Sequence, residues 1–522
     1  MKKVVFWVIF ITVSLCANAQ LTTNEKPSGL QERGRQQSRQ QSPIILAPPD
    51  LSRIAVEDSI REQSYIIVED SIREQSRNAT KDSTNYHVQG AGGGVRFAYP
   101  VWVDYTLENS GVWQELENGN KVWRLKIHIP GALSLHTYYD KFWLPDGCKF
   151  FVYNEETEQS IGAVTSGFIN SSKENPVKYA TALIYGEDIV YEYYQPAYVK
   201  DTAIISIHRI DYGYRYINNP YQKGSRDGLP PLPCHKDICN TPYQNVGRAV
   251  TRISVPSPVG SEWYSGALVN NTNNDMTPYV LTTVIPLCSG LDALGDADAS
   301  DWTFYWNYTS CRSGDISTRG ATIVANGAPT PTQYFPNAFE ADFALLLLSE
   351  DPRCLENFTP YYLGWDRSGN DESSGYCIHH PKGDVQKYTL FNNIQTYSDP
   401  YPKGWSNSSV GWRVFFPLGS LYHGTIINSN TDGILEIGSS GAPLLNSNNQ
   451  IIGTYVMNFD FDCLSPNLLF DFAKLSYTWT GGGAMDPKRR LDYWLAPNNP
   501  SATTCNGRDF NFNIESTPKS TF

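Results

Sequence analysis

One short segment has the composition of a loop that presents a nucleophile. Residues 438–443 have the sequence Gly-Ser-Ser-Gly-Ala-Pro. Glycines on both sides of a serine permit a tight turn that exposes the hydroxyl group of Ser440 and directs backbone N–H groups toward an oxyanion. Because Gly/Ser turns also join ordinary strands, the segment indicates acyl-transfer chemistry only together with other residues of the chain.

The elements that position such a loop are predicted to be strands. Aromatic residues make up 13% of the 522 residues, whereas Met occurs only 4 times, a mixture that suits pleated sheets better than helical bundles. Short apolar or alternating runs are separated by Gly, Pro, Asn and Asp turns, as expected for strands. Examples of these runs are residues 123–129, 149–153, 189–194 and 203–208. We therefore expect an all-β protein.

Changes in composition divide the chain into segments. A cationic start, an apolar run and a final Ala-Asn-Ala predict a signal peptide over residues 1–19. Residues 20–85 are polar, contain a twelve-residue repeat that starts at Val56 and again at Val68, and are predicted to form a disordered leader. We expect the remaining segments to be a small β-sandwich over 86–219, a Pro-rich linker over 220–233, a larger β-rich unit over 234–500 and a C-terminal tail over 501–522.

The charge and the hydropathy of the chain exclude two classes of partner. The formal net charge is −12, which offers no cationic surface for the phosphate backbone of a nucleic acid. Apart from the predicted signal, no apolar stretch reaches the ~20 residues of a membrane span. We expect a secreted, periplasmic or cell-surface protein without a transmembrane segment.

The cysteines indicate disulfides. Removal of the signal with Cys16 leaves nine of the ten cysteines, an odd number, in an oxidising compartment. Cys234 and Cys239 resemble half of a zinc site, but the chain has no second CxxC or HxxxH motif to complete it. We therefore expect disulfide bonds, and neither a metal nor a cofactor.

From Cys234 onward the chain resembles the lysyl endopeptidase branch of the trypsin-like serine peptidases. The matching blocks, in the order of that family, are residues 248–250 (Arg-Ala-Val), 268–272 (Leu-Val-Asn-Asn-Thr), 305–308 (Tyr-Trp-Asn-Tyr), 364–367 (Gly-Trp-Asp-Arg), 378–381 (Ile-His-His-Pro), 438–443, 479–483 (Trp-Thr-Gly-Gly-Gly) and 492–495 (Asp-Tyr-Trp-Leu). The resemblance implies two orthogonal six-stranded β-barrels with the active site in the cleft between them. Residues 123–128 and 144–147 resemble the propeptide region of the same family.

Two of the three catalytic positions of that family are matched. The resemblance implies Ser440 as the nucleophile, the N–H groups of Gly438 and Ser440 as the oxyanion hole, and Asp342 as the acid that orients the histidine base. In the segment 281–288, Leu-Thr-Thr-Val-Ile-Pro-Leu-Cys, Leu287 occupies the position of the general base. Loss of that histidine typically costs a factor of ~10⁶ in turnover.

Three of the four histidines of this unit are not expected to take over as the base. We expect His235 to be held at the exterior of the barrel by the adjacent Cys234, and we expect His379 and His380 to be structural. A base must come within roughly 3 Å of the nucleophile. His423 lies in an insertion and is the candidate for a relocated base.

The specificity pocket also departs from the family pattern. Asp471 is the match for the buried acid that selects lysine. Val456, Met457 and Asn458 replace a His-Gly-Gly wall along which the substrate backbone pairs. Because glycines permit close backbone approach, we expect a narrower entrance here.

The resemblance implies two disulfides, Cys234 with Cys463 and Cys239 with Cys311. A third family disulfide is not expected, because Tyr264 replaces the partner of Cys288. The pairing stays open for Cys148, Cys288, Cys354, Cys377 and Cys505.

Three functions are compatible with these residues. The leading hypothesis is an exported trypsin-like peptidase homologue that lacks proteolytic turnover and binds a protein or peptide. The second is an active serine endopeptidase that uses Ser440 with a relocated base. The third is a surface or matrix protein whose sandwich binds a glycan or a partner. Leu287, Tyr264 and the filled pocket wall favour the first hypothesis, because the three departures fall on one functional surface.

Overall fold

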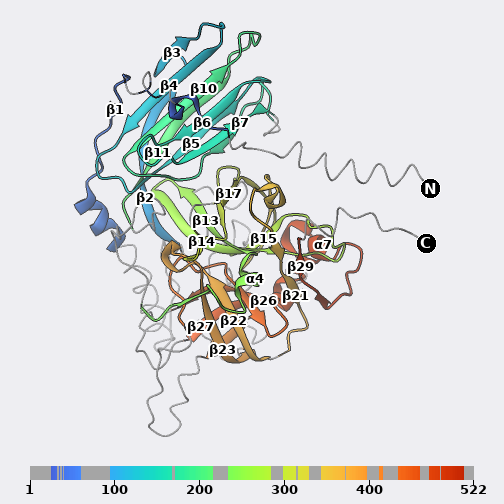
Figure 1. The fold of residues 1–522 in the computed structure, drawn as a ribbon. Coiled ribbons are helices and arrows are strands. Elements are labelled where there is room, and N and C mark those ends of the chain that lie inside the picture. Colours follow the sequence, from blue (N-terminus) through green and yellow to red (C-terminus); the bar gives the residue numbers. More distant parts are fainter. Residues whose placement is uncertain are drawn as a thin grey trace, which may run out of the picture.

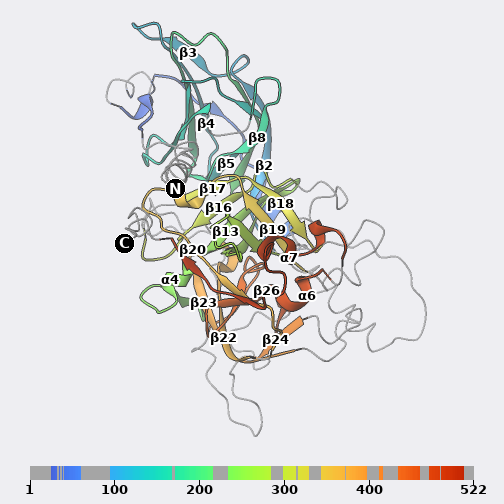
Figure 2. The same ribbon diagram turned by 90° about the vertical axis from the view of Figure 1, so that its right-hand side faces the viewer.

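The computed structural model describes residues 25–31, 35, 38, 40–59, 94–166, 171–215, 233–283, 298–312, 316–327, 342–370, 372–396, 411–415, 433–458, 469–481 and 484–510. Strands dominate and the helices are short, so the predicted all-β fold class is confirmed. Figure 1 shows an N-terminal unit in blue to teal and a C-terminal unit in green to red. Figure 2 also places the N-terminal unit on one side of the C-terminal unit.

Two sheets share one core in the N-terminal unit. The first sheet has the order β1-β4-β10-β6-β7, with β3 paired to β4. Its strands are β1 (Ile44–Ile45), β3 (Val112–Glu115), β4 (Lys121–His128), β6 (Lys149–Tyr153), β7 (Ser160–Val164) and β10 (Asp188–Gln195). Apolar side chains of β4, β6 and β10 pack in one buried cluster with those of the opposing sheet, as in a β-sandwich.

The second sheet runs without interruption from the N-terminal unit into the C-terminal unit, in the order β17-β16-β13-β14-β2-β11-β5-β8. The N-terminal unit contributes β2 (Val95–Thr106), β5 (Ser134–Trp143), β8 (Val177–Ala180), β9 (Ile184–Tyr185) and β11 (Ile204–Gly213). The C-terminal unit contributes β13 (Val250–Ser257), β14 (Gly260–Val269), β15 (Tyr279–Thr282), β16 (Thr303–Trp306), β17 (Ile316–Arg319), β18 (Ala321–Asn326) and β19 (Ala344–Leu348). Strand β14 also pairs with β15, which continues through β19 to β18.

A third sheet contains a circuit of strands that closes on itself. The pairings run β25-β22-β23-β24-β27-β26 and return from β26 to β25. The strands of this sheet are β12 (Lys236–Asp237), β21 (Gly364–Asp366), β22 (Glu372–His379), β23 (Lys387–Thr396), β24 (Gly411–Phe415), β25 (Pro443–Asn446), β26 (Gln450–Asn458), β27 (Leu469–Lys474) and β28 (Thr504–Cys505). The circuit has six strands, whereas the strands from β13 to β19 do not close within the described residues.

Among the described residues, most helices are single turns, and one longer helix covers residues 51–59. They are α4 (Gln244–Gly247), α6 (Leu475–Thr478), α7 (Asp492–Leu495) and the 3-10 turns η1 (Ser28–Leu30), η4 (Pro352–Cys354), η5 (Pro381–Gly383) and η7 (Pro487–Arg489). The predicted tail from residue 501 carries β28 and β29 (Arg508–Asp509), and β29 pairs with β20 (Tyr361–Tyr362).

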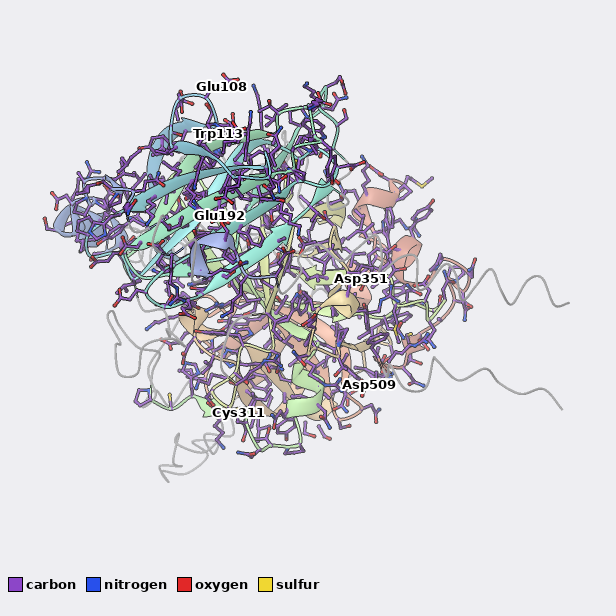
Figure 3. The ribbon with its side chains drawn as sticks, turned by 45° about the horizontal axis from the view of Figure 1, so that its top comes forward. Glu108, Trp113, Glu192, Cys311, Asp351 and Asp509 are labelled. Atoms are coloured by element: carbon purple, nitrogen blue, oxygen red, sulfur yellow. A yellow bond between two sulfur atoms is a disulfide. The ribbon has the colours of Figure 1, made fainter. Side chains whose placement is uncertain are left out.

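Part of the predicted disordered leader has regular structure. The N–H groups of Ser28 and Gly29 donate to the buried carboxylate of Glu192 at 2.7 and 3.0 Å, and Glu192 is labelled in the N-terminal unit in Figure 3. Arg124 Nε lies 2.8 Å from the same carboxylate. The prediction of disorder is wrong for residues 25–31 and 40–59, because buried groups of the sandwich supply partners that the polar composition alone cannot reveal. The predicted signal peptide lies outside the described residues.

Candidate active site

The nucleophile loop, residues 436–442, lies immediately before β25. Gly438 and Gly441 both have a φ of +89°, a backbone conformation that residues with side chains rarely adopt. A Cβ atom on Gly441 would lie 2.1 Å from Thr282 Oγ1 and 2.2 Å from the carbonyl oxygen of Ser265. The loop therefore packs directly on β14 and β15, and glycine is the residue that fits there.

The Ser440 hydroxyl is buried and donates to a backbone carbonyl. Ser440 is 2% exposed, and its Oγ lies 3.0 Å from the carbonyl oxygen of Val456. The carbonyl oxygen of Ser440 accepts a hydrogen bond from the N–H of Ser265 at 2.9 Å. The hydroxyl is thus directed at strand β26, the strand on which the wall of the specificity pocket is predicted.

Asp342 is buried just before β19, in the same region. Its Oδ1 accepts a hydrogen bond from the Thr283 hydroxyl at 2.6 Å. Its backbone carbonyl accepts one from the Thr454 hydroxyl at 3.2 Å, and Thr454 lies two residues before Val456 in β26. The structure therefore brings the predicted nucleophile and the predicted acid to one junction of β15, β19 and β26.

A buried arginine, Arg252, contacts the turn η5, which packs against the nucleophile loop. Arg252 of β13 has its guanidinium centre 3.7 Å from the centroid of the Tyr308 ring, a favourable cation–π distance. Its Nη1 donates to the carbonyl oxygen of Gly383 at 2.9 Å. Lys382, in the same turn as Gly383, contacts the nucleophile loop directly. Its N–H donates to the carbonyl oxygen of Ile437 at 2.7 Å. The turn η5 is thereby fixed against the nucleophile loop.

His379 and His380 are buried behind the nucleophile loop. His379 Nδ1 lies 2.8 Å from Ser439 Oγ. His380 Nδ1 donates to the carbonyl oxygen of Asp384 at 2.9 Å. Burial lowers the pKa of His379 well below its ordinary value and lowers the pKa of His380 to about 3. Both rings are therefore neutral near pH 7, and their contacts support the predicted structural role.

His235 is not at the exterior, and that prediction is wrong. Its side chain is 3% exposed, and Nε2 lies 2.7 Å from Glu436 Oε2. Lys382 Nζ lies 2.9 Å from Glu436 Oε1. The Cys234 disulfide fixes the neighbouring backbone, but the imidazole turns inward to the carboxylate. We refer to Glu436, His235 and Lys382 as the Glu436 cluster; sequence motifs do not predict it.

The residues predicted to form the specificity pocket lie on two paired strands. Val456, which is 1% exposed, precedes Met457 on β26, and the backbone of Met457 pairs with that of Asp471 on β27. The role of Asp471 as the buried acid that selects lysine stays a prediction, because its side chain is not among the described groups. The following site residues also lie outside the described part of the chain or have undescribed side chains: Leu287, His423, Cys463, Met457 and Asn458.

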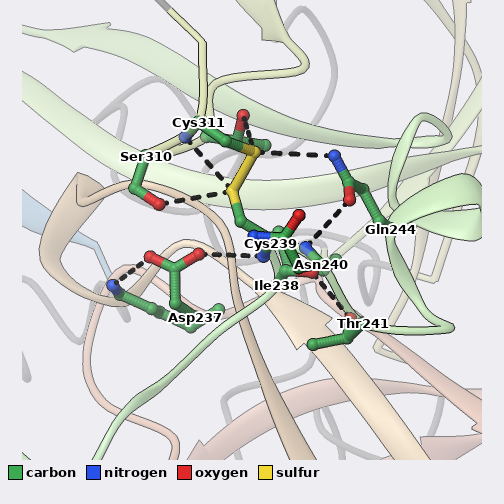
Figure 4. Close-up of a disulfide and its surroundings, with 10 residues drawn as sticks. Asp237, Ile238, Cys239, Asn240, Thr241, Gln244, Ser310 and Cys311 are labelled. Atoms are coloured by element: carbon green, nitrogen blue, oxygen red, sulfur yellow. Dashed lines mark hydrogen bonds and ion pairs between the residues drawn. A yellow bond between two sulfur atoms is a disulfide. The ribbon is translucent and has the colours of Figure 1, made fainter.

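The predicted disulfide between Cys239 and Cys311 is confirmed, with Cα atoms 6.0 Å apart. Figure 4 shows the hydroxyl of Ser310 directed at this bridge. Cys234 is also disulfide-bonded, and its predicted partner Cys463 lies outside the described residues. The cysteines left unassigned by the sequence include three that carry thiols here: Cys148, Cys377 and Cys505.

Two kinds of feature are absent from the described ranges. Within them, the helices lack the length and apolarity of a membrane span. In the same residues, no three His, Cys, Asp or Glu side chains are grouped as a metal site.

Comparison with known proteins supports one class. Residues 232–457 match the family model described as lysyl endopeptidase, C-terminal domain. The chain is 25% identical over 373 residues to the lysyl endopeptidase of Pseudomonas aeruginosa PAO1, an alignment that covers 68% of this chain and 71% of that protein. These similarities support homology to the trypsin-like serine peptidases, and within them to lysyl endopeptidase.

Solved serine protease structures are also similar to this chain, with low sequence identities and low TM-scores. The MamO protease domain from Magnetospirillum magneticum is 14% identical with a TM-score of 0.28, and covers 47% of this chain and 100% of that chain. A thermostable serine protease, AL20, from an extremophilic microorganism is 12% identical with a TM-score of 0.28, and covers 46% of this chain and 99% of that chain. At these scores the likeness carries no functional conclusion.

Proposed function

We propose that this chain is an exported trypsin-like serine peptidase homologue that lacks ordinary proteolytic turnover and binds a protein or peptide at the Ser440 site. The observation that carries the proposal is the 3.0 Å hydrogen bond from Ser440 Oγ to the Val456 carbonyl oxygen. The serine of a catalytic triad instead gives its proton to an imidazole. A hydroxyl group that is not activated by a base is a poor nucleophile.

The surroundings of Asp342 support the same conclusion. In a triad, the carboxylate accepts a hydrogen bond from the N–H of the histidine. Here Oδ1 accepts from the Thr283 hydroxyl at 2.6 Å, so a threonine uses this carboxylate oxygen. Leu287 at the base position of the sequence agrees with a carboxylate that has acquired another partner.

Strand β26 is the surface on which we expect a ligand to lie. Val456 falls at a shift of register between β26 and β27, and residues at such bulges are left out of the ladder. Among the described residues, the pairing of β25 with β26 ends at Thr454, so an extended peptide could add main-chain hydrogen bonds along the residues that follow. An N–H group of the ligand would compete with the Ser440 hydroxyl for the Val456 carbonyl, so Ser440→Ala is expected to preserve ligand binding.

A hydrolysis assay tests the absence of turnover. Mature protein and Ser440→Ala are incubated at high concentration with casein and with a lysyl amide. We expect the two proteins to release product at the same background rate, because Leu287 stands at the position of the general base in the sequence. Hydrolysis that Ser440→Ala abolishes would contradict the proposal and favour the active endopeptidase.

Each alternative function has one observation in its favour. For an active endopeptidase, Ser440 and Asp342 meet at one strand junction, and His423, outside the described residues, is the candidate base. For glycan binding by the sandwich, three aromatic side chains are exposed: Trp102 by 59%, Trp113 by 38% and Tyr198 by 74%.

A further inference from the structure

Strand β2 belongs to both units of the protein. Residues 98–106 of β2 pair with β11 of the N-terminal unit, and residues 95–98 pair with residues 261–263 of β14 in the C-terminal unit. Separation of the units would leave backbone groups of β2 and β14 without these partners. Unpaired backbone groups and free strand edges are unfavourable, so the pairing opposes separation.

Side chains from both units form one buried apolar cluster at this junction. Phe97 of β2 stacks on Trp263 of β14 with ring centroids 3.9 Å apart. The N–H of Leu183 donates to the Tyr305 hydroxyl at 3.0 Å. The N-terminal unit contributes Val95, Phe97, Ala98, Ala182, Leu183 and Tyr185, and the C-terminal unit contributes Trp263 and Tyr305. Separation would transfer this cluster to water, which is unfavourable in proportion to its apolar area.

A buried polar network crosses the same junction. The Tyr138 hydroxyl lies 2.7 Å from Ser261 Oγ, and Ser261 Oγ donates to Asp211 Oδ2 at 2.6 Å. Arg209 forms an ion pair with Asp211 and donates from Nη1 to the carbonyl oxygen of Ser257 at 2.7 Å. These groups are buried and have partners across the junction, and buried polar groups that lose a partner are costly.

The helix over residues 51–59 adds a fourth contact. Asp58 is 2% exposed and accepts a hydrogen bond from Arg96 Nε at 2.7 Å. Arg96 Nη1 donates to the carbonyl oxygen of Val259 at 3.0 Å. Through this arginine of β2, the helix is tied to the hairpin between β13 and β14.

We propose that the N-terminal unit is a permanent subunit of the folded protein, not a propeptide that leaves after cleavage. Its docking surface is the β14 edge of the C-terminal unit in the same chain. A cut within residues 220–233 therefore yields two fragments that remain one particle. The inference concerns assembly alone, and it holds whether or not Ser440 is catalytically active.

The test uses the full chain with a specific protease site inserted within residues 220–233. After complete cleavage, size-exclusion chromatography and native mass spectrometry at micromolar protein should show both fragments in one particle that separates only in denaturant. Two separately eluting fragments, folded or aggregated, would overturn the proposal.

Two glycine variants, one at the junction and one away from it, test whether the pairing of β2 with β14 holds the two fragments together. Gly260 has a φ of +140°, and a Cβ there would lie 2.1 Å from the carbonyl oxygen of Ala98, so Gly260→Val should force β2 away from β14 and release the N-terminal fragment after cleavage. Gly119 has a φ of +77°, but its Cβ would meet only Ala197 at 3.4 Å. Gly119→Ala should leave the cut particle intact. If both variants keep the cut particle intact, or if both release the N-terminal fragment, the β14 edge is not the docking surface.

A conservative variant covers the case in which Gly260→Val does not fold. Tyr138→Phe removes the hydroxyl that contacts Ser261 and keeps the ring. Loss of one buried hydrogen bond across the junction should raise the dissociation constant of the cut protein roughly tenfold, measured by dilution of a fluorescently labelled cut particle. An unchanged dissociation constant would show that this network does not hold the units together.

Discussion

At the scale of single residues, the Glu436 cluster fixes the nucleophile loop without a new N-terminus. In trypsin, a freshly cut N-terminal ammonium group pairs with an aspartate just before the nucleophile. Ser439 occupies that position here, and its hydroxyl lies 2.8 Å from His379 Nδ1. The loop is held instead through Glu436, which lies 2.7 Å from His235 and forms an ion pair with Lys382 at 2.9 Å. All these groups belong to the intact chain, so we expect no trypsin-style activation switch.

Glu436→Gln should destabilise the fold. The carboxylate is buried and compensates Lys382, and removal of one partner of a buried charge pair typically costs about 3 kcal/mol. The measurement is the free energy of unfolding in urea. Glu117→Gln changes an exposed acid and should alter stability by less than about 0.5 kcal/mol. Equal stabilities of the two variants would show that the cluster is not a structural anchor.

The same carboxylate predicts a dependence on pH. Burial raises the pKa of Glu436, but the hydrogen bond with His235 and the charge of Lys382 outweigh it, so the pKa lies below the ordinary value of 4.5. A carboxyl group with a lowered folded-state pKa contributes stability that is complete above its unfolded pKa and is lost as pH falls through the folded value. Below pH 4.5, wild type should lose stability more steeply than Glu436→Gln in urea titrations. Parallel curves would contradict this assignment.

Sequence motifs locate some residues of the site and miss others for a physical reason. Ser440 and Asp342 lie in short blocks whose composition carries a signal, and the structure places both at one strand junction. Glu436 and His235 are 201 positions apart, and their contact exists only because the chain folds back. The inward direction of the His235 ring therefore cannot be predicted from the neighbouring Cys234.

At the scale of elements, close packing of the nucleophile loop on β14 and β15 makes Gly441 sensitive to substitution. Gly441→Ala would place a Cβ 2.2 Å from the Ser265 carbonyl oxygen, whereas Gly119→Ala at a similar positive φ meets only an ordinary contact. We expect Gly441→Ala to lose about 2 kcal/mol more than Gly119→Ala, measured by urea unfolding. Similar losses would mean that the loop can move away from the strands.

The strands are predictable from local patterns, but their partners are not. The short apolar or alternating runs over residues 123–129 and 189–194 fall in β4, apart from Ile129, and in β10, because strand formation follows such local patterns. The pairing of β2 with strands of both units depends on contacts that are distant in the sequence. The helix over 51–59 is likewise missed by composition, because its Asp58 is stabilised by Arg96 of the folded sheet.

At the scale of the whole molecule, a buried histidine lies in the junction between the units. His136 is fully buried, with Nδ1 2.9 Å from the Tyr138 hydroxyl and Nε2 3.4 Å from Thr303 Oγ1 of the C-terminal unit. Burial lowers its pKa from 6.5 to about 4; Arg209 also lowers it, while Asp211 raises it. The junction therefore requires a neutral imidazole.

Mild acid should consequently weaken the protein. Since the unfolded state binds the proton first, stability is complete above pH 6.5 and falls as pH drops toward 4, by about 3 kcal/mol. Urea midpoints between pH 7.5 and pH 4 measure this slope. His136→Asn should flatten it. Equal slopes for wild type and His136→Asn would contradict the prediction.

The central proposal is that the hydroxyl of Ser440 is not activated for nucleophilic attack, because Leu287 stands at the position of the general base, and a fluorophosphonate probe measures that activation directly. The mature protein and its Ser440→Ala variant are treated side by side with the probe, with trypsin as a positive control, and labelling is quantified by intact-protein mass spectrometry. We expect trypsin to be labelled completely while both forms of this protein remain unmodified. Stoichiometric labelling of the wild type that disappears in Ser440→Ala would contradict the claim.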